Sequence, residues 1–453
     1  MKHNARKLLA MVLALAMALS ALAMAEGVTV EIEGEAGFDA SSGAPAGEVA
    51  IDLNLGDGVP GPEGGLSLDL DGGRLEYAGE ASGQANGNGT TANGSGTQDD
   101  PITVRSWDGL HDGLSEAGIR DGESADNPTY YRLIGYIYYE GSSGSPLVVG
   151  GNRNVVLDLN GFEVNRKADS PVEDGYTIRV EGNLTAINSY SFLGSIVGGN
   201  NTGDGGGVVV ADGGVFTLKS GAVGVSKATN GGGVYVAGGG AFNLEGGMVC
   251  MNAARYGGGV YVAGGGAFNM SGGTIGGDGE GYMDPMKNTG IGAGVYVAEG
   301  GAFNMSDGEI SYNEAEPGGK GGGVYAAGAF RLTGGRIVGN KGNSRAGGVY
   351  VTGTFEMTGG RLADHKGSSK GGGVFVTDGG AFTMSGGEIS NNSAKISGGG
   401  VYVEKGALNL SGAAEIRENQ AKDKAGNVML HEPGERISIT GSLGNATPIG
   451  VAL

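Results

Sequence analysis

The sequence predicts an all-β fold, a right-handed parallel β-helix of about 10–11 coils with about 26 residues per coil. Glycine is the first observation: it supplies 100 of the 453 residues against only 11 prolines, a composition that excludes collagen. The second observation is periodicity, because glycine-rich triplets precede valines at intervals of 26, 26, 35, 29, 25, 25 and 27 residues. These valines are Val208, Val234, Val260, Val295, Val324, Val349, Val374 and Val401.

Each repeat contains further positions that recur at fixed places behind the valine. The repeat GGGVFVTDGGAFTMSGGEISNNSAKIS, residues 371–397, indicates three short strands separated by Gly, Asn and Ser turns, which fits one β-helix coil. We expect two internal stacks, one aromatic and one aliphatic. The aromatic positions are Phe216, Phe242, Phe268, Phe303, Phe330, Phe355, Phe382 and Leu408. The aliphatic positions are Val223, Val249, Ile275, Ile310, Ile337, Leu362, Ile389 and Ile416.

A polar ladder is expected three residues after the aliphatic position. Asn and Asp tolerate the left-handed bend of a corner, and a stacked Asn can bond to neighbouring backbone, so we interpret this ladder as structural. His365 then replaces a ladder residue and is not a catalyst. The predicted ladder is Ser226, Asn252, Asp278, Asn313, Asn340, His365, Asn392 and Asn419.

Residues 101–204 precede the regular repeats, which occupy residues 205–450, and we interpret them as a cap followed by irregular opening coils. Ser106 is expected to cap a short helix that presents Trp107, Leu110 and Leu114 on one face. That helix would close the open end of the solenoid.

The first hundred residues divide into an export signal and an acidic segment. Residues 1–25 have a basic start, an apolar stretch and an Ala-Met-Ala cleavage site, which is typical of a signal peptide. Residues 26–100 form an acidic, glycine-rich leader and linker with fifteen Asp or Glu and one basic residue, although residues 28–32 and 66–70 alternate like strands. We therefore expect a secreted or cell-surface protein of bacterial type, without a membrane-spanning segment after cleavage.

Charge and cysteine content bear on the partners and the cross-links that the chain can have. The formal net charge of −20 argues against nucleic acid as a partner, because a phosphate backbone requires a basic face. The chain has one cysteine, so an intramolecular disulfide is excluded. We expect a monomer without cofactor or metal.

Two segments carry a family resemblance. GGGVYVAGGGAFNMSGGTI (257–275) and VVLDLNGFEVNR (155–166) resemble secreted bacterial adhesin-like proteins with the pectin-lyase-like β-helix. The repeats are also similar to those of chlamydial polymorphic membrane proteins. The resemblance covers about residues 101–445 and implies a surface-associated adhesion module that binds a host or environmental glycan or a surface protein.

The same fold implies a second class of function, a polysaccharide-acting lyase or glycoside hydrolase. Such chemistry needs carboxylates clustered on one face, or a constellation containing histidine. His111, His365 and His431 are scattered, and the outward positions Glu309, Arg336, Arg361, Glu388 and Glu415 alternate enough in sign to form weak surface pairs. We expect no catalytic residues and a non-enzymatic function.

An aromatic row is the candidate binding site. One residue separates the paired valines of each repeat, and if both valines point inward this residue points outward, with about 4.8 Å between coils. The candidate binding stripe is Tyr235, Tyr261, Tyr296, Tyr325, Tyr350, Phe375 and Tyr402, preceded by Val209. Alternatively the rings only stiffen the sheet, or a reversed register buries them. The insertion at 277–291, with Tyr282, Met283 and Met286, is a second candidate, or a plain surface excursion.

Overall fold

The computed structural model describes residues 94–452 except 140–145, 192, 278–285, 368, 423–425, 432–434 and 445–448, together with the backbone of six strands between residues 29 and 78. The predicted signal peptide lies outside these residues. The chain divides into two compact units. In the first unit, antiparallel pairing gives the strand order β1-β4-β5-β6, with a separate β2-β3 pair, and the two alternating segments of the leader fall on β1 and β5. The bounds are β1 (Thr29–Glu33), β2 (Gly37–Phe38), β3 (Pro45–Ala46), β4 (Glu48–Asn54), β5 (Gly65–Asp69) and β6 (Arg74–Ala78).

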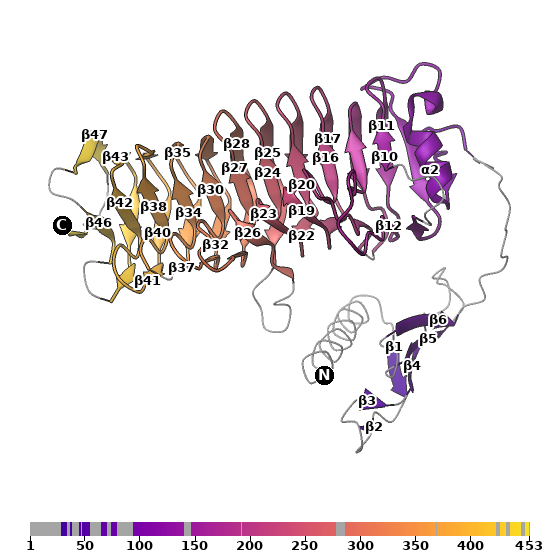
Figure 1. Cartoon of the computed structure of the whole chain (residues 1–453), viewed down its shortest axis with the longest axis horizontal. Helices are drawn as coiled ribbons and strands as arrows, with labels where there is room; N and C mark the ends of the chain where they lie inside the picture. The colour runs from indigo at the N-terminus through magenta and orange to yellow at the C-terminus, as the bar shows by residue number, and fades with distance from the viewer. Residues whose placement is uncertain are drawn as a thin grey trace. The chain divides into compact units, whose positions relative to one another are not determined.

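The second unit is a parallel β-solenoid of about 12 turns with about 27 residues per turn, which confirms the predicted fold class (Figure 1). The strands that carry the paired valines form one sheet, the valine sheet. Its order is β10 (Leu147–Val149), β13 (Ile178–Val180), β16 (Val208–Val210), β20 (Val234–Val236), β24 (Val260–Val262), β27 (Val295–Val297), β30 (Val324–Ala326), β34 (Val349–Val351), β38 (Val374–Thr377), β42 (Val401–Glu404), β46 (Val428–Leu430) and β48 (Val451–Ala452).

The aromatic and aliphatic positions lie on two rows of strands that β25 and β28, each ten residues long, join into one sheet. The phenylalanine row is β8 (Thr129–Leu133), β11 (Asn154–Asp158), β14 (Asn183–Ile187), β17 (Val215–Leu218), β21 (Ala241–Leu244), β25 (Ala267–Gly276), β28 (Ala302–Ser311), β31 (Ala329–Leu332), β35 (Thr354–Met357), β39 (Ala381–Met384), β43 (Ala407–Gly412) and β47 (Ile437–Leu443), with β7 (Ile102–Val104) beside β8. The aliphatic row adds β9 (Ile137–Tyr138), β12 (Glu163–Asn165), β15 (Ser195–Val197), β18 (Ala222–Gly224), β22 (Met248–Cys250), β32 (Arg336–Val338), β36 (Arg361–Ala363), β40 (Glu388–Ser390) and β44 (Glu415–Arg417).

The regular coils have a fourth short strand, so the expectation of three strands per coil was wrong. This strand follows the polar ladder and is only two to four residues long in each coil, with little alternation to mark it in the sequence. The fourth sheet is β19 (Lys227–Asn230), β23 (Ala253–Tyr256), β26 (Thr289–Ile291), β29 (Glu314–Ala315), β33 (Lys341–Gly342), β37 (Lys366–Gly367), β41 (Ser393–Ala394) and β45 (Gln420–Ala421).

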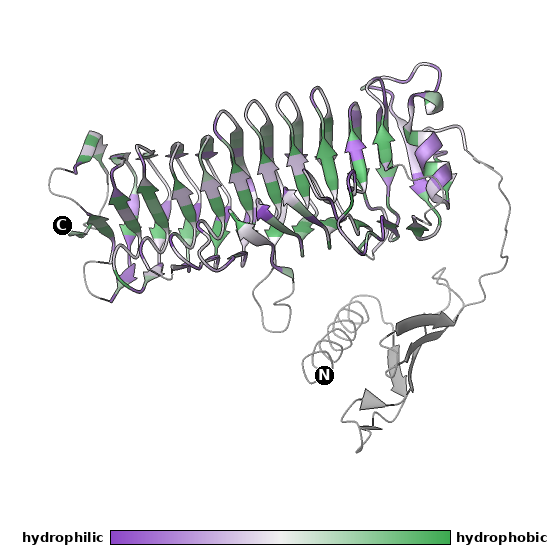
Figure 2. Ribbon diagram, in the orientation of Figure 1, coloured by the Kyte–Doolittle hydropathy of each residue, from purple (hydrophilic) through white to green (hydrophobic). Residues whose placement is uncertain are grey.

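The core is a set of stacked side chains inside the coils, and the strands carry most of the hydrophobic residues (Figure 2). Parallel pairing in register places Phe268 beside Phe303 and Phe303 beside Phe330, with ring centroids 4.5 and 4.7 Å apart. All the predicted aromatic and aliphatic positions are buried, as are both valines of each pair. A fully buried side chain of this size stabilises the fold by about 1.5–3 kcal/mol, so the stacks provide the main stabilisation.

The polar ladder is also buried and structural. Asn313 N donates to Asn340 Oδ1 at 2.9 Å, and Asn340 Nδ2 donates to the Ile310 carbonyl at 2.8 Å, so each amide satisfies the backbone of neighbouring coils. One member was predicted wrongly: Asn288 accepts from Asn252 N at 3.0 Å and occupies this place in the ladder, whereas Asp278, which was predicted for it, lies outside the described residues. The insertion precedes the ladder position in this coil, so a fixed offset from Ile275 points to the wrong residue.

The amino-terminal cap matches its prediction. Helix α2 (Trp107–Leu114) begins after Ser106, whose hydroxyl accepts from Gly109 N, and it buries Trp107, Leu110 and Leu114. A short 3-10 turn, η1 (Glu116–Gly118), follows. The helix packs against β10 at the first coils and closes this end of the core.

Candidate functional site

The predicted stripe is a continuous row of stacked rings on the outer side of the valine sheet. Register pairing joins Tyr235 to Tyr261, Tyr261 to Tyr296 and so on along the sheet. The ring centroids are 5.4 Å apart for Tyr235 and Tyr261, 5.1 Å for Tyr261 and Tyr296, and 4.7 Å for Tyr296 and Tyr325. The valines point inward, so the predicted register is confirmed.

Only the first half of this row reaches solvent. Tyr235, Tyr261, Tyr296 and Tyr325 are half-buried, whereas the rings that continue the row are fully buried. The buried rings are Tyr350, Phe375 and Tyr402, each at most 1% exposed. The expectation that all seven rings point outward into solvent was therefore wrong for the last three.

A ladder of cations accounts for this difference. Lys320, Arg345 and Lys370 each precede the first residue of a corner triplet, and backbone bridges join them from coil to coil. Each lies over the ring of the following coil. The distances to the ring centroids are 4.9 Å for Lys320 over Tyr350, 5.0 Å for Arg345 over Phe375 and 4.7 Å for Lys370 over Tyr402. We call these three residues the cation ladder; they cover the rings and gain from the negative ring faces.

Glu404 holds the far end of the cation ladder in place. Its carboxylate lies 3.5 Å from Lys370 Nζ, 3.7 Å from Arg345 Nη1 and 3.6 Å from His431 Nε2. The spacing of 25 residues between successive cations was visible in the sequence, but only the fold shows that a side chain in one coil covers the ring of the next.

Different residues occupy the same corner position in the earlier coils. Tyr256 lies edge-on to Tyr296 with centroids 5.3 Å apart, and Asp204 lies close to Tyr235. Burial, followed by the Asp204 carboxylate, raises the pKa of Tyr235, so its hydroxyl stays protonated and can donate. Burial, followed by the neighbouring Tyr325, raises the pKa of Tyr296 as well. Half-open rings with protonated hydroxyls are thus available along four coils.

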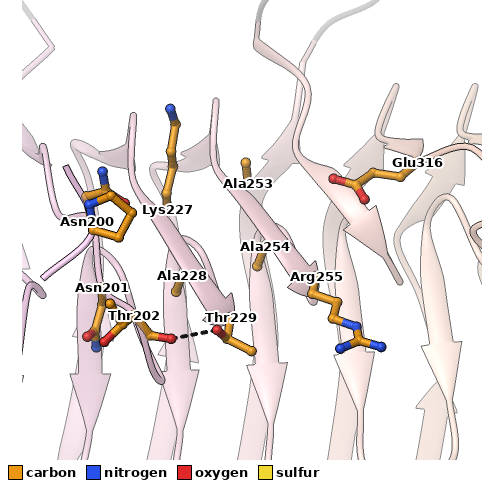
Figure 3. Close-up of a pocket in the computed structure, with 11 residues that line it drawn as sticks. Asn200, Asn201, Thr202, Lys227, Ala228, Thr229, Ala253, Ala254, Arg255 and Glu316 are labelled. Carbon is orange, nitrogen blue, oxygen red and sulfur yellow. Dashed lines mark hydrogen bonds between the residues drawn. The ribbon is translucent and has the colours of Figure 1, made fainter. Parts of the chain in front are cut away.

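A shallow depression of about 490 Å³ lies on the fourth sheet beside this open half of the row (Figure 3). Its walls are polar and small side chains of β19 and β23, together with the segment 200–202 and Glu316. The lining residues are Pro171, Asn200, Asn201, Thr202, Lys227, Ala228, Thr229, Ala253, Ala254, Arg255 and Glu316. The Thr229 hydroxyl donates to the Thr202 carbonyl at 2.7 Å, which ties the depression across two coils. No sequence motif predicted this depression.

Arg255 and Tyr256 connect the depression to the aromatic row. They are consecutive on β23; Arg255 lines the depression, and its guanidinium carbon lies 5.2 Å from the Tyr256 ring centroid. The Tyr256 ring in turn contacts Tyr296. The depression and the open half of the row therefore form one continuous area, which we call the row–groove surface. It combines polar donors, the two exposed cations Lys227 and Arg255, and flat aromatic surface.

His365 and the outward charged side chains have structural partners. His365 is buried in the polar ladder, and burial lowers the pKa of its imidazole to about 3. The outward charges pair along the sheet as expected, with Arg336 Nε 3.1 Å from Glu309 Oε2 and Arg361 Nε 3.9 Å from Glu388 Oε1. In the part of the chain that the structure describes, no three His, Cys, Asp or Glu side chains come close enough to hold a metal ion.

The thiol of Cys250 is not an activated nucleophile. The side chain is buried on β22, and burial raises the pKa of the thiol to about 11. It therefore stays protonated at neutral pH, whereas a nucleophilic cysteine needs a lowered pKa.

The fold and this surface define a class, that of parallel β-solenoid repeat proteins. No protein-family model matches the chain, and no curated protein or solved structure matches it either. Among the described residues, no helix has the length and apolar character needed to cross a membrane.

Proposed function

We propose that this chain is an exported, adhesin-like binding module that holds an extended glycan chain on its row–groove surface. The single observation that supports the proposal most strongly is the continuity of that surface from Arg255 through Tyr256 to the open tyrosines. Exposed stacked rings offer flat apolar area, while neighbouring hydroxyl, amide and cationic groups fix orientation. The export signal in residues 1–25 supports a location at or beyond the cell surface, where such a partner is met.

A repeating scaffold suits a repeating ligand. Successive coils present equivalent groups about 4.8 Å apart, so a polymer can make similar contacts on several coils. Lys227 and Arg255 are exposed, and their charges favour a glycan that carries carboxylate or sulfate groups over a neutral one at this surface. The alternative partner is a surface protein.

The experiment is a glycan-array screen of the secreted chain, followed by titration of the best ligand. The variant Lys227→Ala/Arg255→Ala and the variant Tyr261→Ala/Tyr296→Ala should each weaken binding at least tenfold, and rising salt should weaken the wild type. Tyr312→Ala is the matched control, because Tyr312 is an exposed tyrosine that belongs to neither the row nor the depression.

Three outcomes would contradict the proposal. Unchanged binding by both variants would show that the rings and cations serve the fold alone. Binding to proteins but to no glycan on the array would make a surface protein the partner. Release of unsaturated or reducing ends from an acidic glycan would replace the binding module by a lyase or hydrolase.

A further inference from the structure

A second aromatic surface lies on the opening coils at the amino-terminal end of the solenoid, at the corner between the phenylalanine row and the aliphatic row. In the regular coils this corner is narrow and ends in glycine, for example Gly221 before β18 and Gly247 before β22. The opening coils depart from this pattern. Phe162 stands at the equivalent position in the second coil, Tyr136 lies in the corner of the first, and Tyr190 lies in the longer corner of the third.

The two tyrosine rings are exposed, whereas Phe162 is partly buried and packs against the core. Tyr136 is 55% exposed and Tyr190 is 44% exposed, and the flanking Ile134 and Leu193 are exposed as well. The Tyr136 ring meets Phe162 edge-on, with centroids 5.4 Å apart at 85°, and lies parallel to Tyr138 at 6.0 Å. Exposed rings gathered at one corner of a fold indicate a binding site, because burying such rings would otherwise stabilise the fold.

The corners that carry the rings are held by hydrogen bonds to the buried Asp158 and to Asn188. Asp158 is 2% exposed and accepts from the amide and the hydroxyl of Ser189 at 3.0 and 2.7 Å. Asn188 Oδ1 accepts from Gly161 N at 2.7 Å, and Asn188 Nδ2 donates to the Tyr190 carbonyl at 2.9 Å. The Tyr190 ring lies against Gly161, where a side chain would collide with it. The aromatic corner is therefore preorganised, which lowers the entropic cost of binding.

Polar groups with planar hydrogen-bonding geometry border the rings. Asn165 Nδ2 donates to Glu163 Oε2 at 3.3 Å, and the Glu163 carboxylate is near enough to Tyr136 and Tyr138 to add to the effect of burial in raising their pKa values. Lys167 Nζ lies 3.8 Å from the Tyr138 ring centroid and closes that ring face. Aromatic faces bordered by carboxylate and amide groups match a pyranose ring, which has an apolar face of C–H groups and an equatorial edge of hydroxyls.

We propose that this aromatic corner, formed by Tyr136, Phe162 and Tyr190 with Glu163 and Asn165, binds a neutral β-1,4-linked polysaccharide. Pyranose rings stack on the exposed faces of Tyr136 and Tyr190, and sugar hydroxyls donate to Glu163 and accept from Asn165. The neutral class follows from local charge, because the Glu163 carboxylate beside Tyr136 and Tyr138 would repel a uronate. The β-1,4 linkage follows from shape, because it gives a flat ribbon that can lie across the corners of successive coils.

The test is isothermal titration of the full secreted chain with cellohexaose, and with hexagalacturonate as the acidic comparison. In the Lys227→Ala/Arg255→Ala variant, which removes the cations of the row–groove surface, we expect cellohexaose to bind and hexagalacturonate to bind at least tenfold more weakly. Tyr136→Ala/Tyr190→Ala should weaken cellohexaose binding at least tenfold. Tyr136→Trp should retain binding, because it keeps a flat ring at the same exposed site. Glu163→Gln should weaken binding several-fold, because the amide is a poorer acceptor for sugar hydroxyls.

The variant Tyr261→Ala/Tyr296→Ala is the control that separates this site from the row–groove surface, and it should leave cellohexaose binding unchanged. The proposal is overturned if cellohexaose does not bind at millimolar concentration, if the Tyr136→Ala/Tyr190→Ala variant binds it as the wild type does, or if the Lys227→Ala/Arg255→Ala variant binds hexagalacturonate more tightly than cellohexaose. Loss of binding in the control variant alone would assign the sugar to the row–groove surface and also overturn the proposal.

Discussion

The imidazole of His365 accepts a hydrogen bond from the backbone N–H of Asn340, with 3.1 Å between Asn340 N and His365 Nδ1. Elsewhere in the ladder an asparagine amide has this role and also donates through Nδ2 to the next amide, as Asn313 does to Asn340 Oδ1 at 3.0 Å. The second imidazole nitrogen lies against Gly348 and has no partner among the described residues. His365 therefore keeps the backbone contact of the ladder and interrupts its side-chain contacts.

Replacing His365 by asparagine should stabilise the solenoid. The variant His365→Asn regains amide contacts toward Asn392 and from Asn340, and each hydrogen bond contributes about 0.5–1.5 kcal/mol net. We expect the free energy of unfolding, measured in urea at pH 7, to rise by about 1–2 kcal/mol. Asn313→His is the reciprocal control and should lower it. A fall in the stability of His365→Asn would show that the cavity left by the larger ring outweighs the restored contacts.

The same histidine should make stability depend on pH. Burial lowers the pKa of the folded imidazole to about 3, whereas the unfolded value is about 6.5. Between these values the unfolded chain binds a proton that the folded chain does not, so this contribution is fully present above about pH 6.5 and decreases as the pH falls, by about 1.4 kcal/mol per pH unit.

Comparing the wild type with His365→Asn isolates this effect from other titrating groups. From pH 7 to pH 5 the stability advantage of the variant should grow by about 2 kcal/mol, measured by urea unfolding at each pH. An advantage that does not change with pH would mean that the imidazole keeps an ordinary pKa in the folded chain.

The sequence predicted the core residues correctly because they recur at the same place in every repeat. In-register stacking needs the same residue type at the same place in every coil, so Phe303 and Ile310 could be assigned from spacing alone. An insertion breaks this logic locally, which is why Asn288 was missed in favour of Asp278. The fourth strand was not predicted, because a strand of two residues such as Glu314 and Ala315 is too short to show alternation.

The candidate site was predicted less completely, for a different physical reason. The spacing placed Tyr350 on the outer side of the valine sheet, and that placement is correct. The exposure of a ring depends on the side chains that cover it. Lys320 of the preceding coil covers Tyr350, and a contact between two coils cannot be predicted from the pattern within one repeat. The corner aromatics Tyr136 and Tyr190 carry no repeat signal at all, because they belong to coils that depart from the repeat.

The buried ion pair in the cap should determine the stability of the opening coils. Arg153 Nε lies 3.0 Å from Glu123 Oε1, both side chains are at most 1% exposed, and Arg153 also donates to the carbonyls of Gly113 and Ser115 at the end of α2. Burial would raise the pKa of Glu123, but hydrogen bonds led by Arg153 outweigh it and lower that pKa. Arg153→Met should therefore cost about 3–5 kcal/mol, because it leaves a buried charge unpaired.

Hydrogen exchange can locate this loss along the chain. In Arg153→Met, amides of α2 and of β8 should exchange faster while those of β35 and β39 stay protected, because each coil contacts mainly its neighbours. Arg179→Met is the matched control: Arg179 pairs with Glu181 at 2.8 Å in an exposed position, and we expect a loss of at most about 1 kcal/mol. Uniform destabilisation of all coils by Arg153→Met would contradict a local capping role.

The first and third glycines of a corner triplet should respond differently to alanine, because they are required for different reasons. Gly371 has φ +67, and a Cβ there would lie 2.7 Å from the Val374 carbonyl oxygen. Ala346 nevertheless occupies the same place in the preceding coil at φ +53, so the corner can accommodate a Cβ and Gly371→Ala should cost only about 1–2 kcal/mol. Gly373 has no such precedent, because glycine occupies its position in all eight repeats from residue 205 onward. A Cβ there would lie 2.7 Å from the Gly400 carbonyl oxygen and 3.1 Å from Asn392 Nδ2.

Gly373→Ala must therefore push the next coil or the polar ladder aside, and we expect it to lower the free energy of unfolding at least twice as much as Gly371→Ala does. Thermal unfolding of the two single variants measures the comparison, and hydrogen exchange at Asn392 shows whether the ladder has moved. Equal costs for the two variants would mean that corner conformation alone demands glycine. A larger cost for Gly373→Ala would show that much of the glycine excess arises from close approach between stacked coils.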